Sequence, residues 1–173
     1  MDKSILFILG ASGYIGSSLF ASAKKNAYVI GTSSSGRNGF LPLRLDAPDN
    51  FDYNKITPGD IFFITAAISA PDICAREYDR AWMINVTGTS ILIEKIINRG
   101  ARVIFFSSDT VYGEREDNFD EKATCSPFGK YAEMKHKVEQ NFSGNDLFKA
   151  VRLSYVFSRE DKFSHYLITC ADQ

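Results

Sequence analysis

The sequence predicts a doubly wound α/β protein of three layers, with helices on both faces of a parallel β-sheet. Residues 5–9 form a short, continuously apolar run, which is typical of a strand covered on both faces. Three glycines follow directly, apolar residues then recur at helical spacing over residues 14–26, and a second apolar run occupies residues 28–31. This order of strand, helix and strand is a βαβ unit, and the same alternation continues along the chain.

The remaining elements each have a local signal. The turn residues Pro58, Gly59 and Asp60 precede an apolar run, and two longer segments have apolar residues at helical spacing. A chain of 173 residues with 45% hydrophobic content can bury one sizeable core, so we expect a single domain over residues 1–173. The expected strands are 5–9, 28–31, 41–45, 61–65, 102–107 and 147–153, and the expected helices are 14–26, 78–99, 128–142 and 163–171.

The charge balance favours a small-molecule partner. Lysine and arginine total 20, aspartate and glutamate total 21, and no run of like charge reaches five residues, so neither a nucleic acid nor a membrane surface is indicated. The first residues carry charges and only a short apolar run, which matches neither a signal peptide nor a membrane span. We therefore expect a soluble, cytoplasmic protein.

The cysteines indicate a reducing compartment. Cys74, Cys125 and Cys170 are odd in number, widely spaced and without a CxxC pair, which favours reduced thiols over a disulfide framework or a zinc site. We expect no metal.

The glycines Gly10, Gly13 and Gly16 stand at the first strand-to-helix corner. Glycine tolerates positive φ and allows another backbone or a phosphate to approach closely. At this corner, backbone N–H groups and the positive end of the helix dipole suit a pyrophosphate, so the spacing predicts dinucleotide binding. The alternative is a tight turn with close helix packing. The expected contacts at the corner are Gly10, Ser12, Gly13, Tyr14, Ile15 and Gly16.

The end of the second strand favours NADP over NAD. NAD-binding sites commonly place a carboxylate there, whereas hydroxyls and an arginine accommodate the extra phosphate of NADP. Ser33, Ser34, Ser35 and Arg37 follow this strand, with no carboxylate before Asp46. The alternative is that Arg37 is only a solvated loop charge. We expect Asp46 to accept a hydrogen bond from the adenine amine, and we expect the cofactor to lie against Ala66, Ala67 and Ile68.

A second group of residues indicates proton transfer. Tyr131 and Lys135 are four residues apart, so on a helix both side chains point into one cleft, where the ammonium would lower the pKa of the phenol. Ser108 ends an apolar strand at the edge where ligands bind in such sheets and could hydrogen-bond a reacting oxygen. Serine nucleophile chemistry is disfavoured because the chain has no GxSxG. We expect His136 to be structural or solvated, and His165 lies near the C-terminus with no residue to recruit it.

Four ordered segments resemble the extended short-chain dehydrogenase/reductase family, and in particular its sugar-nucleotide epimerases, dehydratases and 4-ketosugar reductases. They are GASGYIG at 10–16, NVTGT at 85–89, SSDTVYG at 107–113 and PFGKYAEMK at 127–135. The resemblance implies a Rossmann fold, a bound nicotinamide dinucleotide and a catalytic triad of Ser108, Tyr131 and Lys135. It also implies cofactor contacts from Asn85, Ser107, Lys135 and Ser154.

The reaction indicated by the resemblance is hydride transfer on a nucleotide sugar. Thr110 stands where the family's dehydratases have a glutamate, and a threonine cannot act as a carboxylate base, so dehydration is disfavoured. Reduction of a 4-keto sugar and epimerisation by transient oxidation remain, with the first favoured by the NADP-type loop. The family's C-terminal substrate lobe is mostly absent from these 173 residues. The chain could therefore be a fragment, could complete its site as a homodimer, or could be a dinucleotide-binding module without turnover.

Overall fold

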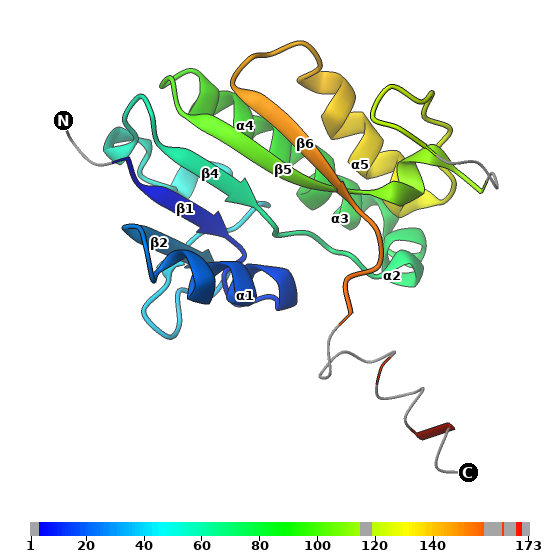
Figure 1. Cartoon of the computed structure of the whole chain (residues 1–173), viewed down its shortest axis with the longest axis horizontal. Coiled ribbons are helices and arrows are strands. Elements are labelled where there is room, and N and C mark those ends of the chain that lie inside the picture. The colour runs from blue at the N-terminus through cyan, green and yellow to red at the C-terminus, as the bar shows by residue number, and fades with distance from the viewer. Residues whose placement is uncertain (1–3, 115–118, 158–163, 165–168, 171–173) are drawn as a thin grey trace.

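The computed structural model describes residues 4–114, 119–157, 164 and 169–170, and its centre is a six-stranded parallel sheet. The strands follow the order β3-β2-β1-β4-β5-β6, and every neighbouring pair is parallel. Their bounds are β1 Leu6–Leu9, β2 Val29–Ser33, β3 Leu41–Pro42, β4 Ile61–Ile64, β5 Arg102–Ser108 and β6 Phe148–Leu153. The prediction of a doubly wound Rossmann-type sheet is confirmed (Figure 1).

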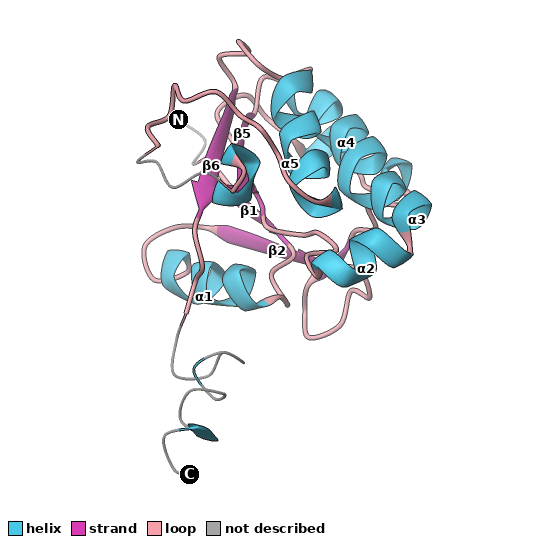
Figure 2. Ribbon diagram, turned by 90° about the vertical axis from the view of Figure 1, so that its right-hand side faces the viewer, coloured by secondary structure: helices cyan, strands magenta, loops and turns pink. Residues whose placement is uncertain are grey.

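Helices lie on both faces of this sheet (Figure 2). One side carries α1, which packs against β1 and β2, while α4 and α5 pack against β5 on the other side. The helix bounds are α1 Tyr14–Ala23, α2 Pro71–Arg76, α3 Tyr78–Trp82, α4 Thr89–Ile97 and α5 Lys130–Asn141. None of the helices in the described part of the chain has the length and apolar character that a membrane span requires.

The main core lies between the sheet and the layer that contains α4 and α5. Phe7, Phe62 and Phe105 come from adjacent strands and are at most 2% exposed, and the rings of Phe7 and Phe62 stack with their centroids 4.3 Å apart. Leu92 and Ile96 of α4 close this core and are fully buried. The apolar runs read from the sequence are therefore the strands that carry the core.

Two predicted elements differ from the observed ones, and one observed helix was not predicted. The third strand was expected over 41–45, but β3 is only Leu41–Pro42, because proline has no N–H to continue the ladder. The helix expected over 78–99 is divided into α3, the π-helical segment η3 at Met83–Gly88, and α4. Helix α2 was not predicted. The helix expected over 163–171 falls mostly outside the described residues and stays a prediction.

Candidate active site

An open cavity of about 1030 Å³ lies at the carboxyl ends of the strands. Its wall includes residues that follow β1, β2, β4, β5 and β6, and two side chains from α5. Strand β1 leads into α1 on one face of the sheet, and β4 leads into the helices of the other face. The cavity therefore opens at the switch point where doubly wound sheets bind their ligands.

The glycine corner between β1 and α1 is tightly packed at two of its three positions. Gly10 has φ +88°, which favours glycine, and a Cβ there would lie 2.9 Å from the backbone of Ala66. A Cβ on Gly16 would lie 2.1 Å from the carbonyl oxygen of Gly10. Gly13 is different, because a Cβ there would meet only the Gly10 carbonyl, at 3.3 Å. The corner thus combines close helix packing with the N-terminal end of α1, which lines the cavity and presents the positive end of the helix dipole to it, as suits a pyrophosphate. Ser12, Tyr14 and Ile15 also line the cavity.

The end of β2 brings hydroxyls to the cavity, but a different arginine from the expected one. Ser33, Ser34 and Ser35 line the wall, as predicted. Arg37 is exposed and is not among the lining residues, whereas Arg44 is. The Nε and Nη2 atoms of Arg44 donate to Asp46 at 2.9 and 2.6 Å, and this hydrogen bonding keeps the pKa of Asp46 below its ordinary value.

Asp46 lines the cavity as predicted, with its carboxylate already engaged by Arg44. Sequence reasoning missed Arg44, although it stands two residues before Asp46 on the same segment.

The segment after β4 forms the middle of the wall. Ala66, Ala67 and Ile68 line the cavity, as predicted. Asn85 does not: it is 4% exposed, it accepts from the Ile68 backbone N–H at 2.8 Å, and it donates to the Ile68 carbonyl at 2.8 Å. The structure therefore does not support the expected direct cofactor contact of Asn85. Its amide instead fixes the backbone against which a ligand would lie.

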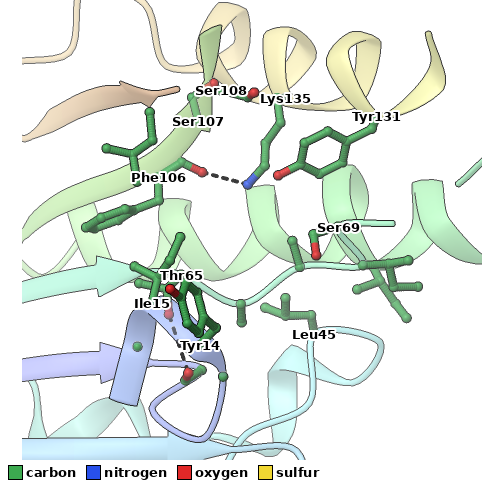
Figure 3. Close-up of a pocket in the computed structure, with 18 of the residues that line it drawn as sticks. Tyr14, Ile15, Leu45, Thr65, Ser69, Phe106, Ser107, Ser108, Tyr131 and Lys135 are labelled. Atoms are coloured by element: carbon green, nitrogen blue, oxygen red, sulfur yellow. Dashed lines mark hydrogen bonds between the residues drawn. The ribbon is translucent and has the colours of Figure 1, made fainter. Parts of the chain in front are cut away.

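Tyr131 and Lys135 extend from α5 into the cavity, with the phenol and the ammonium facing the same space (Figure 3). Lys135 is 4% exposed and donates from Nζ to the carbonyl oxygen of Phe106 at 2.6 Å. Burial lowers the pKa of Lys135 to about 8, although the nearby Glu139 and Cys74 raise it.

The expected lowering of the phenol pKa is wrong for this structure. Burial raises the pKa of Tyr131 to about 12. The ammonium lies 5.6 Å from the centre of the tyrosine ring and is directed at the Phe106 carbonyl. The phenol is therefore neutral at pH 7.

Ser107, Ser108 and Ser154 add hydroxyls near the same end of the cavity. Ser108 donates to Asp109 Oδ1 at 3.2 Å and accepts from the Thr110 side chain at 3.0 Å, so its hydroxyl is held at the end of β5. Ser107 is 5% exposed, and its buried Oγ has no hydrogen-bond partner among the described residues. Because such orphaned groups are costly, Ser107 fits a site that receives a polar ligand.

Fold and site together define a protein of the short-chain dehydrogenase/reductase class, with a glycine corner at one end of the cavity and a serine, tyrosine and lysine at the other. The sequence matches the family described as RmlD substrate binding domain over residues 4–173, and the chain belongs to that family.

Two curated relatives have different activities. The chain is 26% identical over 166 residues to methionine adenosyltransferase 2 subunit beta of Xenopus tropicalis, covering 94% of this chain and 50% of the relative. It is 28% identical over 147 residues to N-acetyl-alpha-D-glucosaminyl-diphospho-ditrans,octacis-undecaprenol 4-epimerase of Escherichia coli O157:H7, covering 81% of this chain and 43% of the relative. The chain thus spans about half the length of these relatives.

Two solved structures share the fold over nearly the whole chain. A dTDP-4-dehydrorhamnose reductase of Clostridium acetobutylicum has a TM-score of 0.81 at 25% identity, with 97% of this chain and 59% of that chain covered. A dTDP-4-dehydrorhamnose reductase of Bacillus anthracis, solved in complex with NADP, has a TM-score of 0.81 at 21% identity, with 99% and 61% covered.

Proposed function

We propose that this chain carries the cofactor-binding and proton-transfer part of an NADP-dependent reductase that acts on the keto group of a 4-keto nucleotide sugar. The observation that carries the proposal is the convergence of Ser108, Tyr131 and Lys135 on one cavity that also contains the glycine corner. The solved reductases with the same fold support the substrate class.

The residues present fit a nicotinamide dinucleotide. The N-terminal end of α1 lines the cavity at the glycine corner and suits a pyrophosphate, and the orphaned hydroxyl of Ser107 offers a polar contact at the other end. No carboxylate occupies the end of β2, where Ser33 is followed by two further serines, and Arg44 supplies a cation to the same region. These features favour NADP over NAD.

A bound reduced nicotinamide would supply the hydride to the keto carbon, and the side chains of this chain deliver the proton. Tyr131 donates its phenolic proton to the carbonyl oxygen, which becomes the alcohol of the product. Ser108 donates a hydrogen bond to the same oxygen by turning its hydroxyl away from Asp109. Lys135, with a pKa of about 8, is mostly protonated at pH 7 and stabilises the phenolate that Tyr131 leaves behind.

The protonation state of Tyr131 supports reduction over epimerisation. Reduction begins with a proton donor, and a phenol with a pKa of about 12 is fully protonated at pH 7. Epimerisation by transient oxidation begins with removal of a proton from a sugar hydroxyl and therefore requires a base. The neutral phenol suits the first direction.

A dinucleotide-binding module without turnover is the second candidate. One finding favours it: a curated relative is named as subunit beta of a methionine adenosyltransferase.

The test is turnover with NADPH and a panel of dTDP-, UDP-, GDP- and CDP-4-keto sugars, followed by the absorbance of the reduced nicotinamide. We expect Tyr131→Phe to lower kcat by roughly 10²–10⁴-fold while the Kd for NADPH, measured by calorimetry, is unchanged. Tyr28→Phe, on an exposed tyrosine, is the matched control. Tight NADPH binding with no turnover on any sugar would instead identify the module.

A further inference from the structure

A cluster of three metal-binding side chains lies outside the cavity. Cys125, His136 and Glu139 each offer one ligand atom, and these atoms all lie within 4.8 Å of one another. None of the three residues lines the cavity described above. The cluster is therefore separate from the proposed site of proton transfer.

The cluster joins a loop to a helix. His136 and Glu139 are three residues apart on α5 and so share one helical face. Cys125 belongs to the connection between η4 (Asp109–Tyr112) and α5. The backbone next to Cys125 is fixed, because the Ser126 N–H donates to the Val111 carbonyl at 3.0 Å. The thiol is consequently positioned by the fold.

His136 has a ring nitrogen without a partner. Its Nε2 lies 3.0 Å from the side-chain nitrogen of Gln140, whereas its Nδ1 is buried and has no hydrogen-bond partner among the described residues. Leaving a buried polar atom without a hydrogen-bond partner destabilises the fold. A metal at Nδ1 would remove that cost.

Glu139 has one carboxylate oxygen less engaged than the other. Arg152 donates to Oε2 at 2.6 and 3.1 Å, but to Oε1 only at 3.2 Å. Oε1 is therefore the oxygen available to a cation. Arg152 would keep its contact with Oε2 and orient the carboxylate, as outer-sphere partners do in metal sites.

We propose that Cys125, His136 and Glu139 form a Zn²⁺ site in which a water molecule completes four-coordination. A thiolate and an imidazole favour zinc, whereas Mg²⁺ and Ca²⁺ prefer a shell of oxygens. The bound ion would tie the loop to α5, the helix that carries Tyr131 and Lys135. Its role is structural, since it lies outside the cavity.

The experiment uses the full chain, freed of metal and kept reduced, and titrates it with Co²⁺ as a spectroscopic substitute. We expect one Co²⁺ per chain, a thiolate-to-cobalt charge-transfer band, tetrahedral visible bands, and displacement by Zn²⁺. Cys125→Ser and His136→Gln should each weaken binding by more than the roughly 10–100-fold caused by loss of an outer-sphere partner. Cys170→Ser, on an exposed cysteine, is the matched control and should bind as the parent chain does.

A second measurement covers the case in which a variant misfolds. Zn²⁺ should slow alkylation of Cys125 in the unmodified chain without slowing that of Cys170, as located by peptide mass spectrometry. Any of three results would overturn the proposal. They are the absence of a charge-transfer band, a band that persists in well-folded Cys125→Ser, and alkylation of Cys125 at the same rate with and without Zn²⁺.

Discussion

At the scale of single residues, two arginines near the end of β2 differ in where they lie. Arg44 lines the cavity beside the serines, whereas Arg37 does not. We therefore expect Arg44→Ala to raise the Kd for NADPH by roughly 10-fold or more and to leave the Kd for NADH nearly unchanged, because only NADPH carries the additional phosphate.

Calorimetry with both coenzymes measures this difference, and Arg37→Ala is the control with the same change of charge. If Arg37→Ala removes the preference for NADPH and Arg44→Ala does not, the assignment of Arg44 is wrong while the cofactor proposal stands. If the parent chain binds neither coenzyme, the proposed function itself fails.

The buried ammonium of Lys135 lowers the stability of the folded protein. Burial lowers its pKa from 10.5 to about 8, so the charged form destabilises the fold at neutral pH by an amount on the order of 3 kcal/mol. We expect Lys135→Met, which keeps an unbranched chain without the charge, to raise the free energy of unfolding at pH 7 and to abolish turnover.

The pH dependence of this effect has a definite sign. Between about pH 8 and 10.5 the native lysine is neutral while the unfolded one still holds its proton, so the unmodified chain gains stability relative to Lys135→Met as pH rises. Urea unfolding at pH 7 and pH 9.5 measures the difference between the two chains. If the free energy of unfolding of Lys135→Met exceeds that of the unmodified chain by an amount that stays constant or grows from pH 7 to pH 9.5, this account of the buried ammonium is contradicted.

At the scale of elements, the π-helical segment η3 holds the cavity wall through Asn85. This side chain makes two 2.8 Å hydrogen bonds to the backbone of Ile68. We expect Asn85→Ala to lower the free energy of unfolding by about 1–3 kcal/mol, because it leaves the Ile68 N–H without its partner and leaves the Ile68 carbonyl to the weaker thiol donor of Cys74. It should also weaken NADPH binding, since the wall at residues 66–68 loses its support.

Asn141→Ala is the matched control, because Asn141 is exposed and its amide donates to the side chain of Ser90 at 3.1 Å in an exposed hydrogen bond. Its effect on stability should stay within about 0.5 kcal/mol. Equal effects of the two substitutions on urea midpoint and NADPH affinity would remove the special role of Asn85.

The sequence predicted the elements whose signals are local. Apolar runs marked the long strands, and the glycine corner marked the start of α1, because a strand covered on both faces and a close helix packing each need particular residues. The π-helical segment was not predictable from periodicity. Its last residue, Gly88, packs against the Leu45 backbone, where a Cβ would lie 1.6 Å from the carbonyl oxygen, and periodicity does not reveal such a contact between residues distant in sequence.

The site shows the same distinction between features readable from local sequence and features set by tertiary packing. Tyr131 and Lys135 share a helical face, and this was readable from their spacing. The hydrogen bonds of Lys135 to the Phe106 carbonyl and of Asn85 to Ile68 could not be read from the sequence, because each partner lies on another element. Spacing on one element therefore predicts which side chains meet in the cavity, while tertiary packing decides what each one contacts and its pKa.

At the scale of the whole molecule, the cavity joins the two halves of the sheet. One end is formed by residues after β1 and β2, and the other by residues after β5 and by α5. A ligand that contacts both ends should stabilise the native state by mass action, by about 2.7 kcal/mol at a concentration of 100 Kd. For a chain of this size, that corresponds to a rise in Tm of roughly 5–11 °C.

We expect NADPH to raise Tm by this amount, and an equimolar mixture of 2′-phosphoadenosine and nicotinamide mononucleotide to raise it much less. The two fragments would each contact one end only, and each would bind with its own loss of translational freedom. Scanning calorimetry with the two additions, at the NADPH concentration that equals 100 Kd, measures the contrast. Equal shifts would mean that the dinucleotide does not span the cavity, whereas a large shift with NADPH alone would agree with a single ligand that reaches from the glycine corner to Tyr131.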